Sequence, residues 1–177
     1  MLGTFTVRSE ETGDRAAIDE VNRLAFGGPH EARLIALLRD EPGFEPELSL
    51  VAVSEDTIAG HILFTPVQIV RENGAVTGAL ALAPMAVRPE HQNQGIGSRL
   101  VRAGLEAGRR RGHQLVVVVG HPQYYPRFGF TPARPHGLEA PFEVPDAAFL
   151  VCPLAAGALD DVRGVVHYHP AFGAVGD

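Results

Sequence analysis

Residues 82–98 read Leu-Ala-Pro-Met-Ala-Val-Arg-Pro-Glu-His-Gln-Asn-Gln-Gly-Ile-Gly-Ser, and this stretch decides the fold. It begins as an apolar strand, passes through a loop with two close glycines, and leads into a helix. Backbone N–H groups at a helix start have no partner inside the helix, and the helix dipole favours negative charge there. Gly95 and Gly97 let the backbone approach a phosphate without a Cβ in the way, and Ser98 can add a hydroxyl donor. The stretch therefore predicts an anion-binding turn.

Two glycines before a helix are also compatible with an ordinary strand-to-helix turn. The known phosphate loops do not fit, because no Gly-Lys-Ser/Thr follows, as a Walker loop requires. The first glycine of a dinucleotide-binding fingerprint is missing, and the preceding strand follows a hairpin instead of opening a βαβ unit. A phosphate-binding turn of another kind and a purely structural turn both remain open at this point.

Further elements are predicted on both sides of this turn from hydrophobic periodicity and from glycine and proline breaks. Asn73-Gly74 is a strong hairpin signal. Pro66 suggests a bulge or an unpaired position in its strand. The predicted strands cover residues 5–8, 48–53, 58–70, 77–87, 115–119 and 149–154, with another beginning at 128–131. Four helices are predicted. The first follows a cap at Thr12 or Asp14, the second starts at about His30, the third covers 97–111, and a short fourth one starts at Pro122.

This order predicts one mixed α/β (α+β) domain with a central, partly antiparallel sheet of about seven strands flanked by helices. The β-branched run 115–119 is typical of a buried central strand. We expect the domain to cover residues 1–156. The tail, residues 157–177, is rich in glycine, alanine and proline, and we expect a C-terminal extension that wraps on the domain surface.

Composition limits the function classes. The chain has 177 residues, 45% of them hydrophobic, and a net charge of −6, which argues against a nucleic-acid binder and weakly against an anionic membrane surface. Cys152 is the one cysteine, so an intrachain disulfide is excluded, and we expect a buried structural thiol. We expect no signal peptide and no membrane span, hence a soluble cytoplasmic protein. His167 and His169 have no third ligand at sensible spacing, so no metal is expected.

A second block, Tyr124-Tyr125-Pro126-Arg127-Phe128-Gly129-Phe130, follows the glycine loop after one helix and one strand. The first block, with Gln92, Gly95 and Gly97 in a Gln-x-x-Gly-x-Gly pattern, resembles the acetyl-CoA loop of the GNAT superfamily of N-acetyltransferases. The second block resembles that superfamily's Tyr-x-x-x-Gly-Phe segment. The resemblance covers roughly residues 5–154, and two blocks in the right order are much more specific than either one alone.

The resemblance implies a fold, a co-substrate and a set of site residues. The strand 115–119 would splay from its neighbour and open a wedge for acetyl-CoA. The backbone of three strand residues would contact the pantetheine arm: Met85, Ala86 and Val87. The N–H groups of the loop would hold the pyrophosphate: Gln92, Asn93, Gln94, Gly95, Ile96, Gly97 and Ser98. Tyr125 would lie near the CoA sulfur and protonate the leaving thiolate.

The expected chemistry is direct attack of an amine on the thioester in a ternary complex. The backbone N–H of Val87 would stabilise the oxyanion, and Tyr125 would act as general acid, with Tyr124 as its substitute. The general base is open, because residues 80–87 contain no carboxylate. His61, His121, a water relay and an amine already deprotonated in solution are the candidates.

The sequence thus predicts acetyl transfer from acetyl-CoA to an amine of a small molecule or a protein, by a monomer or homodimer. The alternative is a catalytically weak acyl-CoA-binding sensor or interaction module on the same fold, suggested by the missing strand carboxylate. Transfer of a longer acyl chain is a third possibility. The acceptor would be chosen by residues 22–38 and 134–146, which carry no readable code.

Overall fold

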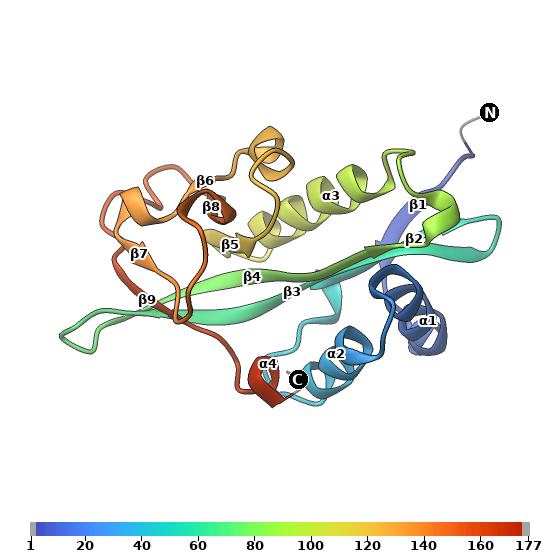
Figure 1. The fold of residues 1–177 in the computed structure, drawn as a ribbon, viewed down its shortest axis with the longest axis horizontal. Coiled ribbons are helices and arrows are strands. Elements are labelled where there is room, and N and C mark those ends of the chain that lie inside the picture. Colours follow the sequence, from blue (N-terminus) through green and yellow to red (C-terminus); the bar gives the residue numbers. More distant parts are fainter. Residues whose placement is uncertain (1–2, 175–177) are drawn as a thin grey trace. The chain divides into compact units, whose positions relative to one another are not determined.

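The computed structural model describes residues 3–174. Four α-helices and nine strands follow one another along this part of the chain, with short 3-10 helices between them (Figure 1). The helices are α1 (Arg15–Phe26), α2 (His30–Arg39), α3 (Ile96–Arg110) and α4 (Ala171–Ala174). The strands are β1 (Thr6–Ser9), β2 (Ser49–Ser54), β3 (Thr57–Val70), β4 (Val76–Val87), β5 (Leu115–Val119), β6 (Thr131–Pro132), β7 (Leu138–Glu139), β8 (Phe149–Pro153) and β9 (Gly164–His167).

The strands follow the order β1-β2-β3-β4-β5-β8-β6, and β9 pairs with both β3 and β7. The pairs β4–β5 and β7–β9 are parallel, whereas β1–β2, β2–β3, β3–β9, β5–β8 and β6–β8 are antiparallel. The mixed, partly antiparallel sheet expected from the sequence is confirmed, with nine strands where about seven were predicted. Two compact units share the chain: residues 1–65, 83–107 and 170–177 form the first, and 66–82 and 108–169 form the second.

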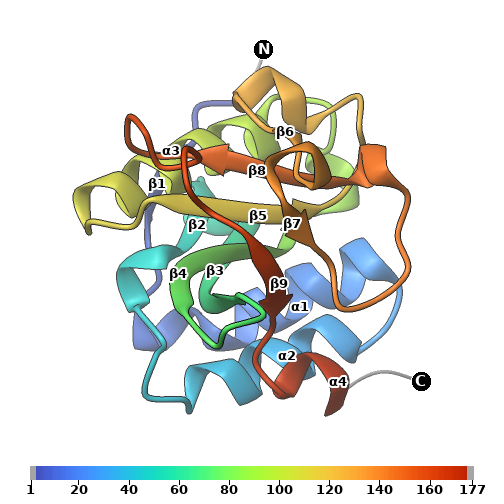
Figure 2. The ribbon, with the colours of Figure 1, turned by 90° about the vertical axis from the view of Figure 1, so that its left-hand side faces the viewer.

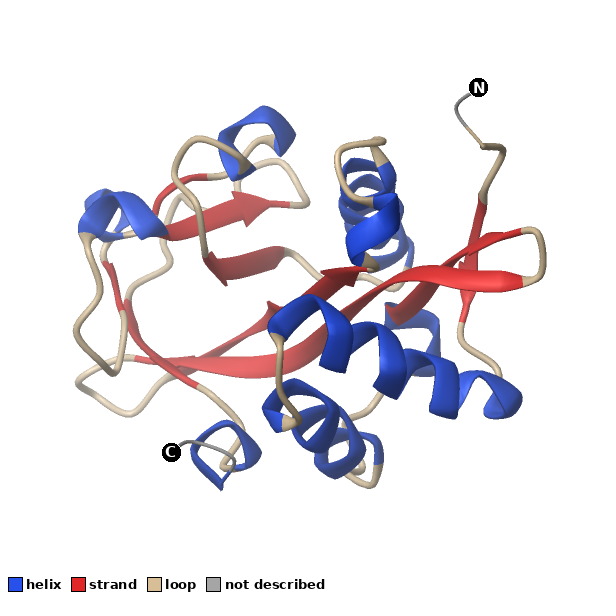
Figure 3. Cartoon of the chain, turned by 45° about the vertical axis from the view of Figure 1, so that its right-hand side comes forward, coloured by secondary structure: helices blue, strands red, loops and turns tan. Residues whose placement is uncertain are grey.

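The first unit places helices on both faces of its strands. Helices α1 and α2 lie side by side on one face, and α3 lies on the other (Figures 1 and 3). One apolar core joins α1, α2, α4 and their strands, because the helices turn their periodic apolar side chains inward. Its buried members are Ile18, Val21, Leu34, Ile35, Leu38, Val51, Ile58, Leu63, Ala86 and Ala171.

Helix α3 approaches the strands closely because small residues line the contact. A Cβ added to Gly104 would lie 2.1 Å from the Phe64 ring, and one added to Gly60 would lie 3.0 Å from Ile96 and from Leu100. These two glycines therefore give the helix the room to pack against β3. The packing fixes where α3 begins, which is the end of the predicted anion-binding turn.

The second unit is built around β5, whose neighbours are β4 and β8 (Figure 2). The recorded β4–β5 ladder joins Leu80 to Val116 and Ala81 to Val117. Four of the five residues of β5 are buried, as expected of a central strand. The core of this unit consists of Val67, Ile69, Ala79, Ala81, Leu115, Val117, Ala133, Leu138, Phe149, Val151, Val162 and Val166.

Three predictions about elements need correction. The short helix is a 3-10 helix at Tyr125–Phe128, with Pro126 near its start, and not at Pro122. Gly129 then adopts a left-handed conformation, so the next strand begins only at Thr131. The tail supplies β9, which pairs with β3, and α4, whose Ala171 is buried in the first core, so it is more than a surface wrap.

Other predictions are confirmed closely, and β5 has the predicted bounds. Pro66 lies in β3 between the β2 ladder, which ends at Leu63, and the β9 ladder, which begins at Gln68. The division of the chain at residue 156 stays a prediction, and residues 175–177 of the tail lie outside the described part. Between residues 3 and 174, no helix has both the length and the apolar character needed to cross a bilayer.

Candidate active site

The glycine loop follows the end of β4 at Val87, and the next residue, Arg88, binds its start to neighbouring elements. The Arg88 backbone N–H donates to Ala59 O at 2.8 Å, and its Nε donates to Ile58 O at 2.7 Å. Its Nη2 forms an ion pair with Glu20 of α1 at 2.9 Å. A short 3-10 helix, Pro89–His91, follows. These bonds fix the start of the loop to β3 and to α1.

Two glutamine side chains brace the loop from within. Gln92 Nε2 donates to Val87 O at 3.1 Å, and Gln94 Nε2 donates to Glu90 O at 3.3 Å. Both carbonyls belong to the residues just before the loop, so each amide group closes a local turn. The side chains of Gln92 and Gln94 therefore shape the loop. The backbone N–H of Gln92, one of the predicted pyrophosphate donors, donates to Pro89 O at 3.4 Å.

Two residues of the loop have a left-handed backbone conformation. Asn93 and Gly95 have positive φ angles of 62° and 84°, and Arg99 N donates to Gly95 O at 3.1 Å, which closes the first turn of α3. Within residues 3–174, no hydrogen bond is recorded from the backbone amides of Asn93, Gln94, Gly95 and Ile96. Successive backbone N–H groups in residues that alternate between right-handed and left-handed conformations commonly form a concave anion-binding site, called a nest. A turn with these four amides thus lies where the sequence predicts anion binding, and anion binding itself stays a prediction.

The space above Gly95 is empty, since a Cβ built there would meet no atom within 4 Å. Ser98 and Gly97 occupy the first turn of α3 and are half-buried. On the strand leading to the loop, Ala86 is buried in the core, whereas Met85 and Val87 are half-buried. The first unit thus collects all the predicted loop and strand residues into one continuous stretch, and their chemistry fits a phosphate-bearing ligand.

Tyr125 lies in the second unit, at the start of a 3-10 helix. Its side chain is 7% exposed and is the centre of an aromatic cluster. The ring meets the edge of Tyr124 at a centroid distance of 5.1 Å, Phe130 at 5.5 Å and Phe128 at 6.4 Å. Arg127 stacks over Tyr124, with its Cζ 4.7 Å from the ring centroid.

Burial raises the pKa of Tyr125 to about 12, and the neighbouring Tyr124 contributes in the same direction. The phenol is therefore protonated throughout the neutral range, as a proton donor must be. Its hydroxyl makes no hydrogen bond to any residue of the described chain, and it is not among the fully buried polar atoms. Tyr124, the substitute acid, is half-buried, and its amide and that of Tyr125 bind the carbonyl of His121, which is itself exposed.

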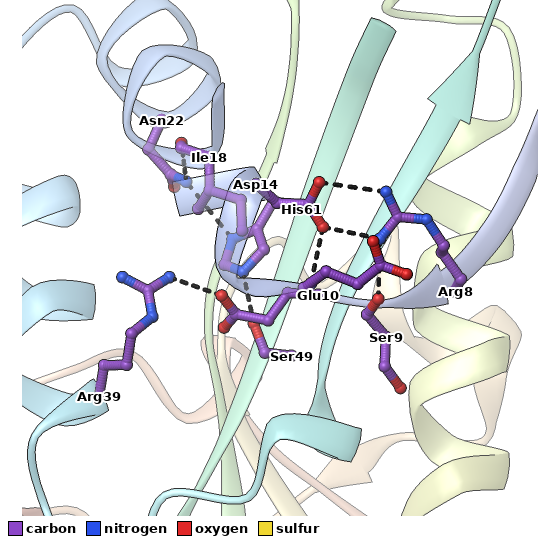
Figure 4. Close-up of polar contacts among 10 residues, drawn as sticks. Arg8, Ser9, Glu10, Asp14, Ile18, Asn22, Arg39, Ser49 and His61 are labelled. Carbon is purple, nitrogen blue, oxygen red and sulfur yellow. Dashed lines mark hydrogen bonds and ion pairs between the residues drawn. The ribbon is translucent and has the colours of Figure 1, made fainter. Parts of the chain in front are cut away.

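His61 occupies the middle of β3 and is completely buried (Figure 4). Ser49 Oγ lies 2.9 Å from its Nε2, and Asn22 Nδ2 lies 3.4 Å from its Nδ1. Burial, assisted by Arg39, lowers the pKa of His61 to about 3. Both ring nitrogens are occupied and no solvent reaches them, so this placement does not support the general base that the sequence suggested and favours a structural role.

Charged pairs around His61 were missed by sequence reasoning. Arg39 and Glu10 form an ion pair at 2.9 Å with side chains only 9% and 6% exposed, and Arg8 pairs with Asp14 at 2.6 Å (Figure 4). The hydrogen bonds and charge of Arg8 hold the pKa of Asp14 below its usual value. No periodicity in the sequence links these positions, which come from β1, α2 and the turns beside them.

The described residues contain no cluster of three or more metal-ligating side chains. Cys152 is buried, as expected, and burial raises the pKa of its thiol. The candidate groups of the first unit are consequently backbone amides, and the candidate group of the second unit is a buried phenol.

Comparison with known proteins agrees with this chemistry. Residues 6–133 match the acetyltransferase (GNAT) domain. An uncharacterized N-acetyltransferase of Escherichia coli, YjhQ, is 43% identical over 143 residues, which cover 80% of this chain and 78% of YjhQ. The crystal structure of E. coli YhbS, a GNAT family N-acetyltransferase in complex with CoA, has a TM-score of 0.88 and 34% identity, covering 97% of this chain and 93% of YhbS.

A GNAT family acetyltransferase from Brucella melitensis, solved with acetyl-CoA, has a TM-score of 0.78 and 32% identity, covering 96% of this chain and 99% of its own. The matched domain spans most of the chain, and the two solved relatives share nearly their full length with it. The chain therefore belongs to the GNAT family and is an N-acetyltransferase.

Proposed function

We propose that this protein binds acetyl-CoA through its glycine loop and transfers the acetyl group to an amine of a small molecule or a protein. The observation that carries the proposal is the row of backbone amides from Asn93 to Ile96, which donate to no group of the described chain. Four such donors at the positive end of a 15-residue helix suit the two charges of a pyrophosphate. The CoA and acetyl-CoA held by the relatives support this choice of ligand.

The residues have the following roles in this proposal. The loop, with Gly97 and Ser98 in the first turn of α3, holds the pyrophosphate. The backbone of Met85, Ala86 and Val87 binds the pantetheine arm. The Val87 N–H stabilises the oxyanion that forms when the amine nitrogen attacks the thioester carbonyl carbon. When the carbon–sulfur bond breaks, the Tyr125 hydroxyl gives its proton to the thiolate.

The attacking nitrogen must also lose a proton. Residues 80–87 offer no carboxylate, and His61 is enclosed by protein with its pKa lowered to about 3. We therefore assign proton removal to a water relay, or to the bulk solvent before the amine binds. His121, which is exposed and lies beside the tyrosine block, is the remaining side-chain candidate for the base. Both substrates bind together, so no covalent enzyme intermediate is formed and the buried Cys152 takes no part.

The test is release of free thiol from acetyl-CoA across a panel of amines. Tyr125→Phe should lower kcat by about 10²-fold or more, the usual contribution of a general acid. Tyr168→Phe is the matched control, because burial also raises the pKa of Tyr168 to about 12 although it lies in another segment. CoA binding without thiol release on any amine would favour the acyl-CoA sensor instead. An unimpaired Tyr125→Phe would refute the acid assignment.

A further inference from the structure

Gly120 lies directly beneath the ring of Tyr125. It follows the last residue of β5, and its backbone N–H donates to Ala148 O at 2.9 Å. A Cβ added to Gly120 would lie 2.4 Å from Cε2 and 2.9 Å from Cδ2 of Tyr125. No side chain fits between this backbone and the ring, so the contact requires glycine although no positive φ demands it.

The ring cannot move aside freely. Tyr124 and Phe130 meet it edge to face, at interplanar angles of 84° and 72°. The Tyr125 amide is tied to His121 O at 3.4 Å, only one residue beyond Gly120. The phenol is therefore held between the end of β5 on one side and two aromatic rings on the others.

We propose that Gly120 is a positioning residue for catalysis, because its missing side chain lets the Tyr125 ring rest on the end of β5 and so fixes the hydroxyl. This inference depends on the proposed function, in which Tyr125 is the general acid. An ordinary contact begins at 3.4 Å, so Gly120→Ala must displace the ring by about 1 Å (3.4 − 2.4). A displacement of that size at a reacting group can lower the rate by on the order of 10²-fold.

The experiment is a double-mutant cycle measured on kcat with four proteins: wild type, Gly120→Ala, Tyr125→Phe and the double variant. Gly120→Ala should lower kcat at least about tenfold in the wild type, with little change in the KM for acetyl-CoA. In the Tyr125→Phe background it should change kcat by less than about twofold, since the hydroxyl is already gone. Gly78→Ala is the control, because a Cβ there meets no atom within 4 Å.

A second measurement does not depend on activity. Gly120→Ala should make Tyr125 more exposed and so lower its pKa from about 12 toward its ordinary value of 10.0. Alkaline ultraviolet titration of each protein, with the matching Tyr125→Phe spectrum subtracted, measures this change. If Gly120→Ala does not fold, thermal unfolding of Gly120→Ala in a Tyr125→Ala background tests the contact instead. The smaller side chain at position 125 leaves room for the new Cβ, so Gly120→Ala should destabilise this background less than it destabilises the wild type.

The outcomes separate the two proposals. Equal losses from Gly120→Ala with and without the Tyr125 hydroxyl would overturn the role of Gly120 and leave the acid intact. An unchanged phenol titration would overturn it as well, as would equal instability in the Tyr125→Ala background. Full activity of Tyr125→Phe would refute the acid itself and, with it, any catalytic role for Gly120.

Discussion

The buried histidine should make the stability of the protein fall steeply as the solution is acidified. His61 is 0% exposed and lies against Ser49 and Asn22, and its pKa is lowered from 6.5 to about 3. Between these two values the unfolded chain takes up a proton on this ring, whereas the folded protein does not. The stabilisation is therefore complete above pH 6.5 and is lost as the pH falls toward 3.

The magnitude follows from the two pKa values. Each pH unit inside the window changes the free energy of unfolding by about 1.4 kcal/mol. At pH 5 the loss from this one group is about 2 kcal/mol, a large share of the 5–15 kcal/mol that is typical of a domain. Carboxylates that are paired in the folded state, such as Asp14, add to the loss only at lower pH, because their ordinary pKa is 3.8.

The assay is urea unfolding of the wild type and of His61→Gln at several pH values from 8 to 5. Glutamine does not titrate, so the stability advantage of the wild type should shrink by about 2 kcal/mol across this range. His167→Gln, at an exposed position of β9, is the control and should follow the wild-type curve. A difference in stability between wild type and His61→Gln that stays constant from pH 8 to 5 would show that His61 does not cause the loss at acid pH.

Two further predictions concern packing and buried charge in the first unit. Gly104→Ala places a Cβ 2.1 Å from the Phe64 ring and should lower the free energy of unfolding by about 1–3 kcal/mol in thermal or urea unfolding. Gly13→Ala meets no atom within 4 Å and serves as its control, so equal effects of the two variants would contradict the packing argument. Glu10→Gln leaves the Arg39 charge buried and unpaired, so it should lower the free energy of unfolding by about 3–5 kcal/mol. The double variant Glu10→Gln/Arg39→Met removes that charge and should regain most of the lost stability. A double variant no more stable than the single one speaks against that charge argument.

Local signals explain why much of the fold could be predicted. The glycine and proline breaks at 27–29 separate α1 from α2, and the Asn73-Gly74 turn joins β3 to β4. The β-branched run 115–119 gave the bounds of β5 because a continuous apolar run suits a central strand. In each case the signal lies within the element or directly beside it.

The short strands could not be predicted because distant partners make them. β7 has only two residues, and β9 lies in the glycine-rich tail, where it forms by pairing with β3 at Gln68–Val70. Residues 128–131 are expected to begin a strand, but the left-handed Gly129 ends a 3-10 helix at Phe128. Tertiary pairing and one backbone angle decided these segments.

The candidate site divides in the same way. The loop 92–98 could be predicted because the glycines, the strand before it and the helix after it are all consecutive in the sequence. The burial of His61 could not, because nothing near it indicates that Ser49 and Asn22 would meet its two nitrogens. The contact between Gly120 and Tyr125 was also invisible, since a glycine at a strand end usually marks only a turn.

Calorimetric titration of the wild type and of two matched glycine variants with CoA measures whether the amides of the glycine loop bind this ligand. Gly95 and Gly74 have φ angles of 84° and 85°, and a Cβ at either meets no atom within 4 Å, so alanine costs the backbone about the same at both. The wild type and Gly74→Ala should bind CoA equally, whereas Gly95→Ala, which strains the amide row by about 1–2 kcal/mol, should bind about tenfold more weakly. No heat of binding with the wild type, or equal affinities for Gly95→Ala and Gly74→Ala, would contradict the assignment of CoA binding to these amides.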